Sequence, residues 1–267
     1  MLQATDLVKR FDTTTALDHL SCSIPAGVVF GLVGSNGAGK STFLRVIAGI
    51  YRADDGQMLL DDQPVFENEP VKEQIVLVPD ELYFLSQANL KRMAILYRRS
   101  FPNFSLEYCN RLIDLFQLDP KKAIRTFSKG MKRQAAIALA LACRPRYLLL
   151  DEAFDGLDPL MRDVVRKIIR RDVAECNTTV VISSHSLREL EDTCDWLALL
   201  HQGNLIFTST KDELTQQAPE GLEALFVRRL NEAGYSFETA LDDLYATKPT
   251  GDISGALSQN EGEVIAQ

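Results

Sequence analysis

Residues 34–41 read GSNGAGKS, and this segment restricts the possible folds of the chain more than any other. It matches the pattern G-x-x-x-x-G-K-[ST] of a phosphate-binding loop at every fixed position. An apolar run at residues 28–33 predicts a buried strand before the loop, and residues 40–48 predict a helix after it. Strand, glycine-rich loop and helix in this order let backbone N–H groups and a helix N-terminus surround phosphate groups. A glycine-rich turn that arose by chance would not need a buried strand before it and a helix after it.

The loop therefore predicts a site for a nucleoside triphosphate. We expect Lys40 to reach the β- and γ-phosphates and the hydroxyl of Ser41 to bind Mg²⁺. The residues expected to contact the nucleotide are Gly34, Ser35, Asn36, Gly37, Ala38, Gly39, Lys40, Ser41 and Thr42.

A second buried strand is predicted at residues 147–151, and two carboxylates, Asp151 and Glu152, stand at its end. Asp151 is placed to hold Mg²⁺ through water, and Glu152 is placed to polarise a water that attacks the γ-phosphate. A strand followed by an acidic helix cap is the structural alternative. The phosphate-binding loop upstream favours the catalytic interpretation, because phosphoryl transfer needs both parts.

Short strands and helices alternate along most of the chain, which predicts an α/β fold with a mainly parallel sheet. Further strands are expected at residues 57–60, 74–78 and 179–182, and a hairpin around Gln202 and Gly203. Helices are expected at residues 88–99, 105–116, 131–143, 161–175 and 187–194. From about residue 220 the pattern weakens, with a short helix at residues 222–230 and a polar tail after Lys248.

Composition excludes several other classes of protein. The chain has 267 residues, 46% of them hydrophobic, and a net charge of −8, which suits a globular protein and argues against a general nucleic-acid binder. Five scattered cysteines with no C-x-x-C spacing and only three histidines predict reduced thiols and no zinc site. The N-terminus shows no signal-peptide pattern, and no apolar run approaches the ~20 residues of a membrane span.

Between the two phosphate-site elements, Phe127 to Met131 lead directly into a predicted helix, and here the chain resembles the ATP-binding subunits of ABC transporters. Their signature segment, usually LSGGQ, lies at this place in the sequence. Ser128 and Gly130 match it, whereas Phe127, Lys129 and Met131 depart from it. By resemblance, residues 128–131 contact the γ-phosphate of the ATP that is bound by an opposite subunit. A plain helix N-cap at Ser128 is the alternative interpretation.

Three further positions match motifs of the same family. Asp158, in Gly-Leu-Asp-Pro just after the acidic pair, resembles the D-loop that crosses the dimer interface. His185, after the strand at residues 179–182, resembles the switch histidine that contacts the γ-phosphate. Phe11 lies where the family has an aromatic residue that stacks on adenine, although a core aromatic would also fit this position.

One departure from the family concerns the chemistry directly. After the strand at residues 74–78 the family usually carries a glutamine that senses Mg²⁺ and the attacking water, and here Asp80 stands at that position. A carboxylate binds Mg²⁺ at least as well as an amide does, but it also repels the γ-phosphate. The expected metal ligands are therefore Ser41, Asp80 and Asp151.

The resemblance covers roughly residues 1–215 and implies a definite architecture. It implies a P-loop NTPase core of the RecA-like type, an N-terminal antiparallel β subdomain, and a helical subdomain inserted at about residues 82–130. Residues 216–267 would form a C-terminal extension, which holds nine acidic and three basic residues and so carries −6 of the net charge. Basic residues gather instead in the helical subdomain, where they could face an anionic membrane or simply solvent.

The activity implied by the resemblance is ATP hydrolysis, with Mg²⁺, in a dimer that holds two ATP molecules and drives a separate membrane permease. The dimer would be a homodimer or a pair with a sister subunit, at the cytoplasmic face of the membrane and without nucleic acid. The segment pattern is most similar to subunits of ABC-2-type export permeases. Residues 82–85 are apolar and would be a permease-docking patch if exposed or ordinary core if buried. The alternatives are a regulatory subunit or a soluble ABC-type ATPase with weak hydrolysis.

Overall fold

The computed structural model describes residues 1–235 of the chain, which divides by its contacts into a unit of residues Met1–Val227 and a second unit of residues Arg228–Gln267. The larger unit holds both sheets and all the candidate site residues. Most of the predicted acidic extension, including the polar tail after Lys248, lies outside the described residues. The boundary expected after residue 215 stays a prediction.

A six-stranded sheet forms the centre of the larger unit, with strand order β10-β9-β3-β8-β7-β6. Its four inner pairs, β3/β8, β3/β9, β6/β7 and β7/β8, are parallel, and only β10 joins β9 as an antiparallel hairpin. The strands are β3 (Val29–Val33), β6 (Ile75–Val78), β7 (Tyr147–Asp151), β8 (Thr179–Ser184), β9 (Trp196–His201) and β10 (Asn204–Thr210). The expected mainly parallel sheet is thus confirmed.

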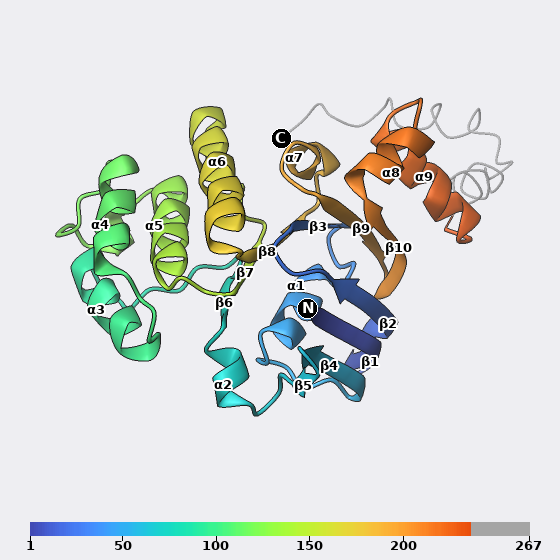
Figure 1. Cartoon of the computed structure of the whole chain (residues 1–267), viewed down its shortest axis with the longest axis horizontal. Coiled ribbons are helices and arrows are strands. Elements are labelled where there is room, and N and C mark those ends of the chain that lie inside the picture. The colour runs from blue at the N-terminus through green and yellow to red at the C-terminus, as the bar shows by residue number, and fades with distance from the viewer. Residues whose placement is uncertain (236–267) are drawn as a thin grey trace, which may run out of the picture. The chain divides into compact units, whose positions relative to one another are not determined.

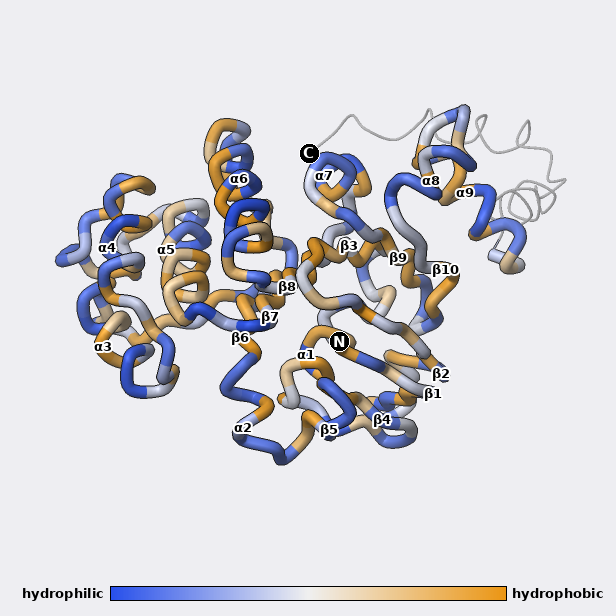
Figure 2. The backbone as a smooth tube through the Cα atoms, viewed as in Figure 1, coloured by the Kyte–Doolittle hydropathy of each residue, from blue (hydrophilic) through white to orange (hydrophobic). Residues whose placement is uncertain are grey.

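The inner strands are continuously hydrophobic because helices cover both faces of a parallel sheet. All residues of β3 and β7 are buried, and the inner strands are orange in Figure 2. Five covering or connecting helices are α1 (Lys40–Ile47), α2 (Glu69–Lys72), α6 (Pro159–Cys176), α7 (Leu187–Glu191) and α8 (Lys211–Gln217). Helix α9 (Leu222–Glu232) follows α8.

A second, antiparallel sheet is built mainly from the N-terminal residues and has the order β2-β1-β4-β5. Its strands are β1 (Leu2–Phe11), β2 (Thr14–Ile24), β4 (Asp55–Leu60) and β5 (Gln63–Pro64). Side chains from both sheets and from α1 pack into one buried cluster that includes Leu20, Phe30, Phe43, Leu60 and Leu149. Burial of each such side chain contributes about 1.5–3 kcal/mol, so this shared core fixes α1 between the sheets.

A helical insertion separates β6 from β7 and lies on one side of the parallel sheet (Figure 1). It consists of α3 (Leu90–Ser100), α4 (Leu106–Leu115), the short 3₁₀ helix η1 (Ile124–Thr126) and α5 (Lys129–Ala142). The side chains of Asn89, Ser105 and Ser128 cap α3, α4 and α5 by accepting a hydrogen bond from a backbone N–H three residues later. Because Ser128 is the cap, α5 begins at Lys129, two residues before the predicted start.

Two findings bear on the redox and membrane expectations. Four cysteines are buried and Cys176 is exposed, and burial raises the pKa of Cys109 to about 11 and that of Cys22 to about 12, so these thiols stay protonated. Over residues 1–235, no helix combines the length and the apolar character that a bilayer crossing requires.

Candidate functional site

The glycine-rich loop between β3 and α1 fits tightly against the backbone of both sheets. A Cβ on Gly34 would lie 2.4 Å from the carbonyl oxygen of Leu200, and one on Gly39 would lie 2.5 Å from that of Ala16. Gly39 has φ +105° and is the N-cap of α1, without any side-chain hydrogen bond to the first turn. The N-terminus of α1 therefore keeps its N–H groups for another acceptor, as an anion site requires.

Lys40 is buried at 6% exposure and points its ammonium back into the loop. Its Nζ donates to the carbonyl oxygens of Gly34 at 2.7 Å and Ser35 at 3.1 Å, and it lies 3.4 Å from Oε1 of Glu152. All three partners are oxygen acceptors. An ammonium forms charge-assisted hydrogen bonds with phosphate oxygens, so Lys40 is placed to contact a phosphate held by this loop.

A cavity of about 420 Å³ opens over this loop. Its walls come from the loop and α1, the start of β2, and the ends of strands β6, β7 and β9. The lining residues are Thr14, Thr15, Ala16, Asn36, Gly37, Ala38, Gly39, Lys40, Ser41, Thr42, Asp80, Glu152 and Gln202. The structure thus brings most of the predicted nucleotide contacts together with Asp80 and Glu152.

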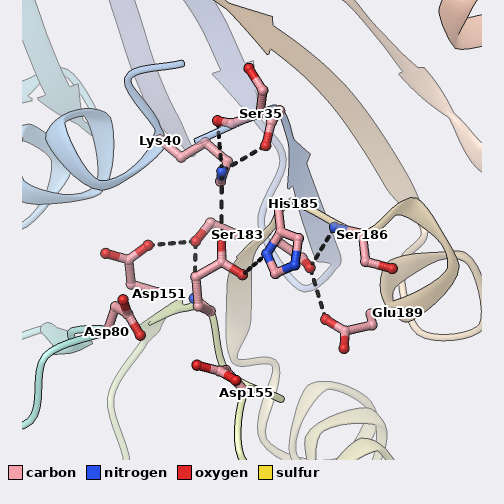
Figure 3. Close-up of polar contacts among 12 residues, drawn as sticks. Ser35, Lys40, Asp80, Asp151, Asp155, Ser183, His185, Ser186 and Glu189 are labelled. Carbon is pink, nitrogen blue, oxygen red and sulfur yellow. Dashed lines mark hydrogen bonds and ion pairs between the residues drawn. The ribbon is translucent and has the colours of Figure 1, made fainter. Parts of the chain in front are cut away.

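The acidic end of β7 is joined to β8 by a hydrogen-bond network (Figure 3). Ser183, fully buried on β8, donates through Oγ to Oδ1 of Asp151 at 2.6 Å. The backbone N–H of Glu152 donates to the carbonyl and to the hydroxyl oxygen of Ser183, each at 3.2 Å. Glu152 itself has φ +48°, in the left-handed region. Such strain is typical of functional positions.

His185 follows β8 and lies beside the same carboxylate. Its Nδ1 is 3.0 Å from Oε2 of Glu152, and its side chain is 57% exposed. Glu152 therefore pairs through one carboxylate oxygen with the ammonium of Lys40 and through the other with the imidazole. A carboxylate so placed can accept a proton from water, and the imidazole can orient it.

The oxygen ligands expected for Mg²⁺ come from the start of α1 and from the carboxyl ends of β6 and β7. Ser41 and Asp80 line the cavity, and Asp151 ends the neighbouring strand with 1% exposure. Hydroxyl and carboxylate oxygens suit Mg²⁺, which also keeps water and phosphate oxygens as ligands. Within residues 1–235 no three His, Cys, Asp or Glu side chains converge on a metal position. Hydroxyl and carboxylate donors of this kind fit a Mg²⁺ ion that arrives with a triphosphate.

The signature residues lie apart from this cavity in the same chain. Ser128 accepts a hydrogen bond from the N–H of Met131 at 3.2 Å as the cap of α5. Lys129 forms an ion pair at 2.5 Å with Asp155, and its hydrogen bond lowers the pKa of that carboxyl. A Cβ on Gly130 would lie 2.6 Å from the carbonyl oxygen of Gly156. The start of α5 is thus packed against the loop that precedes α6.

Two other predicted residues also have structural partners. Asp158 caps α6 by accepting from the N–H of Met161 at 2.9 Å. Phe11, at the end of β1 and 39% exposed, contacts Tyr51 edge to face with 5.3 Å between ring centroids. Neither residue lines the cavity. Their roles in a dimer and in adenine binding stay predictions.

Two buried residues of the site were absent from the sequence-based prediction. Ser183 links Asp151 to Glu152, and Arg133 on α5 contacts the chain after β6 and the end of β7. A sequence signal for Arg133 existed, because it stands just before an apolar, buried stretch of α5. For Ser183 the sequence offered no signal beyond its place at the end of a core strand.

Comparison with known proteins agrees with this geometry. Residues 17–155 match the sequence profile of the ABC transporter family. The chain is 34% identical over 217 residues to the ABC transporter ATP-binding protein YtrB of Bacillus subtilis, covering 81% of this chain and 74% of that protein. It is 30% identical to the linearmycin resistance ATP-binding protein LnrL of the same organism, covering 87% and 77%. A solved ATP-binding subunit of an ABC transporter superposes with a TM-score of 0.78 at 25% identity, covering 86% of this chain and 99% of that one.

Proposed function

The chain belongs to the family of ABC transporter ATP-binding proteins, and on that premise we propose that it is the ATP-hydrolysing motor subunit of an export-type transporter. The relative LnrL is named for resistance to linearmycin, and this supports export as the direction of transport. The observation that carries the proposal is the convergence of Lys40 and His185 on Glu152, whose carboxylate lines the cavity above the loop.

Each of these residues has a distinct task in the proposed reaction. Lys40 and the N–H groups of residues 36–42 bind the phosphates, and the charge of Lys40 stabilises the negative charge that develops on the γ-phosphoryl group. Glu152 accepts a proton from the attacking water, and His185 orients the Glu152 carboxylate from its other side. Mg²⁺, held by Ser41, Asp151 and Asp80, would neutralise charge between the β- and γ-phosphates.

We place the signature residues on the ATP of a second subunit. Ser128 to Met131 do not line the cavity of their own chain, and the capped N-terminus of α5 presents backbone N–H groups to an anion. Two chains arranged head to tail would complete two such sites, as a homodimer or with a sister subunit. ATP binding would close the pair, and hydrolysis would reopen it.

The partner that uses this motion is proposed to be a separate membrane permease. Tyr83 and Leu85, just after Asp80, are 86% and 57% exposed. The residues just before them in the sequence line a cavity of about 410 Å³. Its lining residues are Asp80, Glu81, Leu82, Lys129, Lys132 and Arg133. Exposed apolar side chains beside a cavity suit a docking site, which would hold the chain at the cytoplasmic face of the membrane.

Substitution of the proposed base tests the function directly. Glu152→Gln should abolish ATP turnover and keep ATP binding, because the amide cannot accept the proton although it preserves the shape of the side chain. The measurement is phosphate release together with equilibrium ATP binding. Glu175→Gln, which removes an exposed carboxylate paired with Arg171 on α6, is the matched control and should retain the parent rate. A Glu152→Gln protein that turns over at the parent rate would refute the assignment.

A regulatory subunit with weak hydrolysis is the second candidate, favoured by Lys129 in the signature and by Asp80. Lys129 is held by Asp155 and stands where a small residue is usual in the family. The basal ATPase rate of the purified protein, with and without its permease, separates the two candidates. A rate that stays at the level of the Glu152→Gln protein in both conditions would favour the regulatory role.

A further inference from the structure

Arg133 lines the proposed docking cavity, but neither docking nor the binding of nucleotide and metal explains why its charge is buried. Its side chain is 1% exposed, on a helix whose residues 135–142 are apolar and buried. Burial of a guanidinium costs several kcal/mol unless oxygen atoms surround it. Its contacts should therefore show what it does.

The guanidinium joins the ends of two neighbouring strands. Its Nη1 donates to the carbonyl oxygen of Pro79 at 2.8 Å and to that of Asp151 at 3.3 Å. Its Nη2 donates to the carbonyl oxygen of Asp80 at 2.9 Å and to Oδ1 of the same residue at 3.0 Å. Four hydrogen bonds thus fix the chain after β6 against the end of β7.

Asp80 lies at the boundary between two cavities. It lines the cavity above Lys40 and also the cavity that Glu81 and Leu82 line. Its carboxylate is 47% exposed, and within residues 1–235 Arg133 is the cation of its ion pair. A negative group on the wall of a triphosphate site repels the ligand unless a cation compensates it.

We propose that Arg133 is a positioning residue that neutralises Asp80 and holds it on the wall of the nucleotide cavity. The proposal rests on the proposed ATP site. With Arg133 in place, the two residues together present little net charge to the phosphates, and Asp80 keeps a fixed direction. Without Arg133, the carboxylate is an uncompensated negative charge beside the ligand.

The charge state of ATP distinguishes this role from a merely structural one. ATP free of Mg²⁺ carries roughly two more negative charges than its Mg²⁺ complex, so an uncompensated carboxylate repels the free form more strongly. A loss of packing would weaken both forms equally. The informative quantity is therefore the ratio of the Kd measured in EDTA to the Kd measured with Mg²⁺.

The experiment is calorimetric titration of the full chain with ATP under both conditions. Arg133→Gln should raise the ratio of the two Kd values about tenfold, equivalent to about 1.4 kcal/mol of added repulsion. The double variant Asp80→Asn with Arg133→Gln should bring the ratio back to the parent value or below it, because the repelling charge is gone and a proposed Mg²⁺ donor is lost with it. Arg133→Lys keeps the charge and should hold the ratio near the parent value, and it remains informative if the glutamine variant fails to fold.

A matched control removes another Arg–Asp pair, Arg144 and Asp172, which lie 3.4 Å apart and do not line the nucleotide cavity. Arg144→Gln with Asp172→Asn should lower thermal stability and leave the ratio unchanged. An unchanged ratio in Arg133→Gln, or a ratio that the double variant fails to restore, would overturn the inference. A parent protein that binds no ATP in either condition would instead overturn the proposed function, and the inference with it.

Discussion

The Lys40 side chain is a buried positive charge that oxygen acceptors hold in place. It is buried, it follows a glycine with a left-handed backbone, and its acceptors come from the loop and from Glu152. A lysine is rarely so deeply buried unless oxygen acceptors surround it. Its three oxygen partners keep the charge in place.

Removal of that charge should abolish most of the nucleotide affinity. Lys40→Ala loses charge-assisted hydrogen bonds worth about 1.5–3 kcal/mol each, so the Kd for ATP should rise at least about tenfold. Equilibrium binding measured by fluorescence or calorimetry checks this. Lys167→Ala, which removes an exposed lysine from α6, is the control and should bind as the parent does. Equal Kd values for the two variants would contradict the role of Lys40.

Residues of the site differ in how far the sequence alone could predict them. The loop at residues 34–42 was predictable because its glycines and Lys40 follow a fixed local pattern. Glu152 and His185 could be proposed from motifs, but their 3.0 Å contact depends on the pairing of β7 with β8. Arg133 and Ser183 escaped prediction because their partners are 18 to 54 residues away in the chain.

Among the elements, the start of α5 shows best how packing overrides local preference. Gly130 lies in the first turn, where alanine would ordinarily favour a helix by up to about 1 kcal/mol. The carbonyl oxygen of Gly156 leaves no room for a methyl group. The helix and the loop before α6 can approach each other only because Gly130 has no side chain.

Gly130→Ala should therefore destabilise the protein by about 1–3 kcal/mol, since the added Cβ overpacks a backbone contact. The sign of the change in unfolding free energy distinguishes the two effects, because helix propensity alone predicts a gain in stability. Urea unfolding of the two proteins gives the difference in free energy. A variant that is more stable than the parent would show that the loop moves aside without cost.

The ion pair between Lys129 and Asp155 at the same junction should make stability depend on acid. Its hydrogen bond lowers the folded-state pKa of Asp155 below the usual 3.8, so the stabilisation is complete above that value and is lost as the pH falls through the lower folded pKa. In Asp155→Asn that contribution is absent. Unfolding free energies measured from pH 6 to pH 2.5 should differ between parent and variant at the upper end, and the difference should shrink as the pH falls below 3.8. A constant difference across this range would contradict the assignment.

Element boundaries were harder to predict than element types. The strand at residues 147–151 was predicted to the residue, because a continuous apolar run ending in Asp151 has few alternatives. The helix expected at residues 187–194 ends at Glu191 instead. The long strands β1 and β2 were expected only through the resemblance. One face of their sheet packs on a helix and the other faces solvent, so buried and exposed residues are mixed along each strand and the sequence shows no continuous apolar run.

For the whole molecule, the separation of Ser128 from the nucleotide cavity has a testable consequence. A substitution at Ser128 should leave ATP binding to a single chain intact and affect only the assembly of two chains. A substitution at Lys40 should instead weaken ATP binding to the single chain, and the ATP-dependent assembly is then lost as well. The two kinds of variant should therefore complement each other in a mixture.

In the Glu152→Gln background, Ser128→Arg should bind ATP with a Kd within about twofold of the parent value and fail to form the ATP-dependent dimer. Light scattering after gel filtration measures the mass of the particle and so distinguishes the dimer from the single chain. Loss of the α5 cap costs about 1 kcal/mol, so thermal unfolding is recorded alongside to verify folding. An equimolar mixture with Lys40→Ala should restore some dimer, because one composite site is then intact. A Ser128→Arg protein that dimerises as well as its parent would remove the signature from the interface.

The close approach of Gly34 and Gly39 to the carbonyl oxygens of Leu200 and Ala16 also defines how this loop could be redesigned. Those two oxygens belong to strands of the two different sheets, so a methyl group at either glycine would push one sheet away from α1. Ser35 and Asn36, by contrast, are exposed. A library randomised over residues 34–39 should accept new side chains at these two positions and return glycine at 34 and 39, even under selection for folding alone and without any nucleotide.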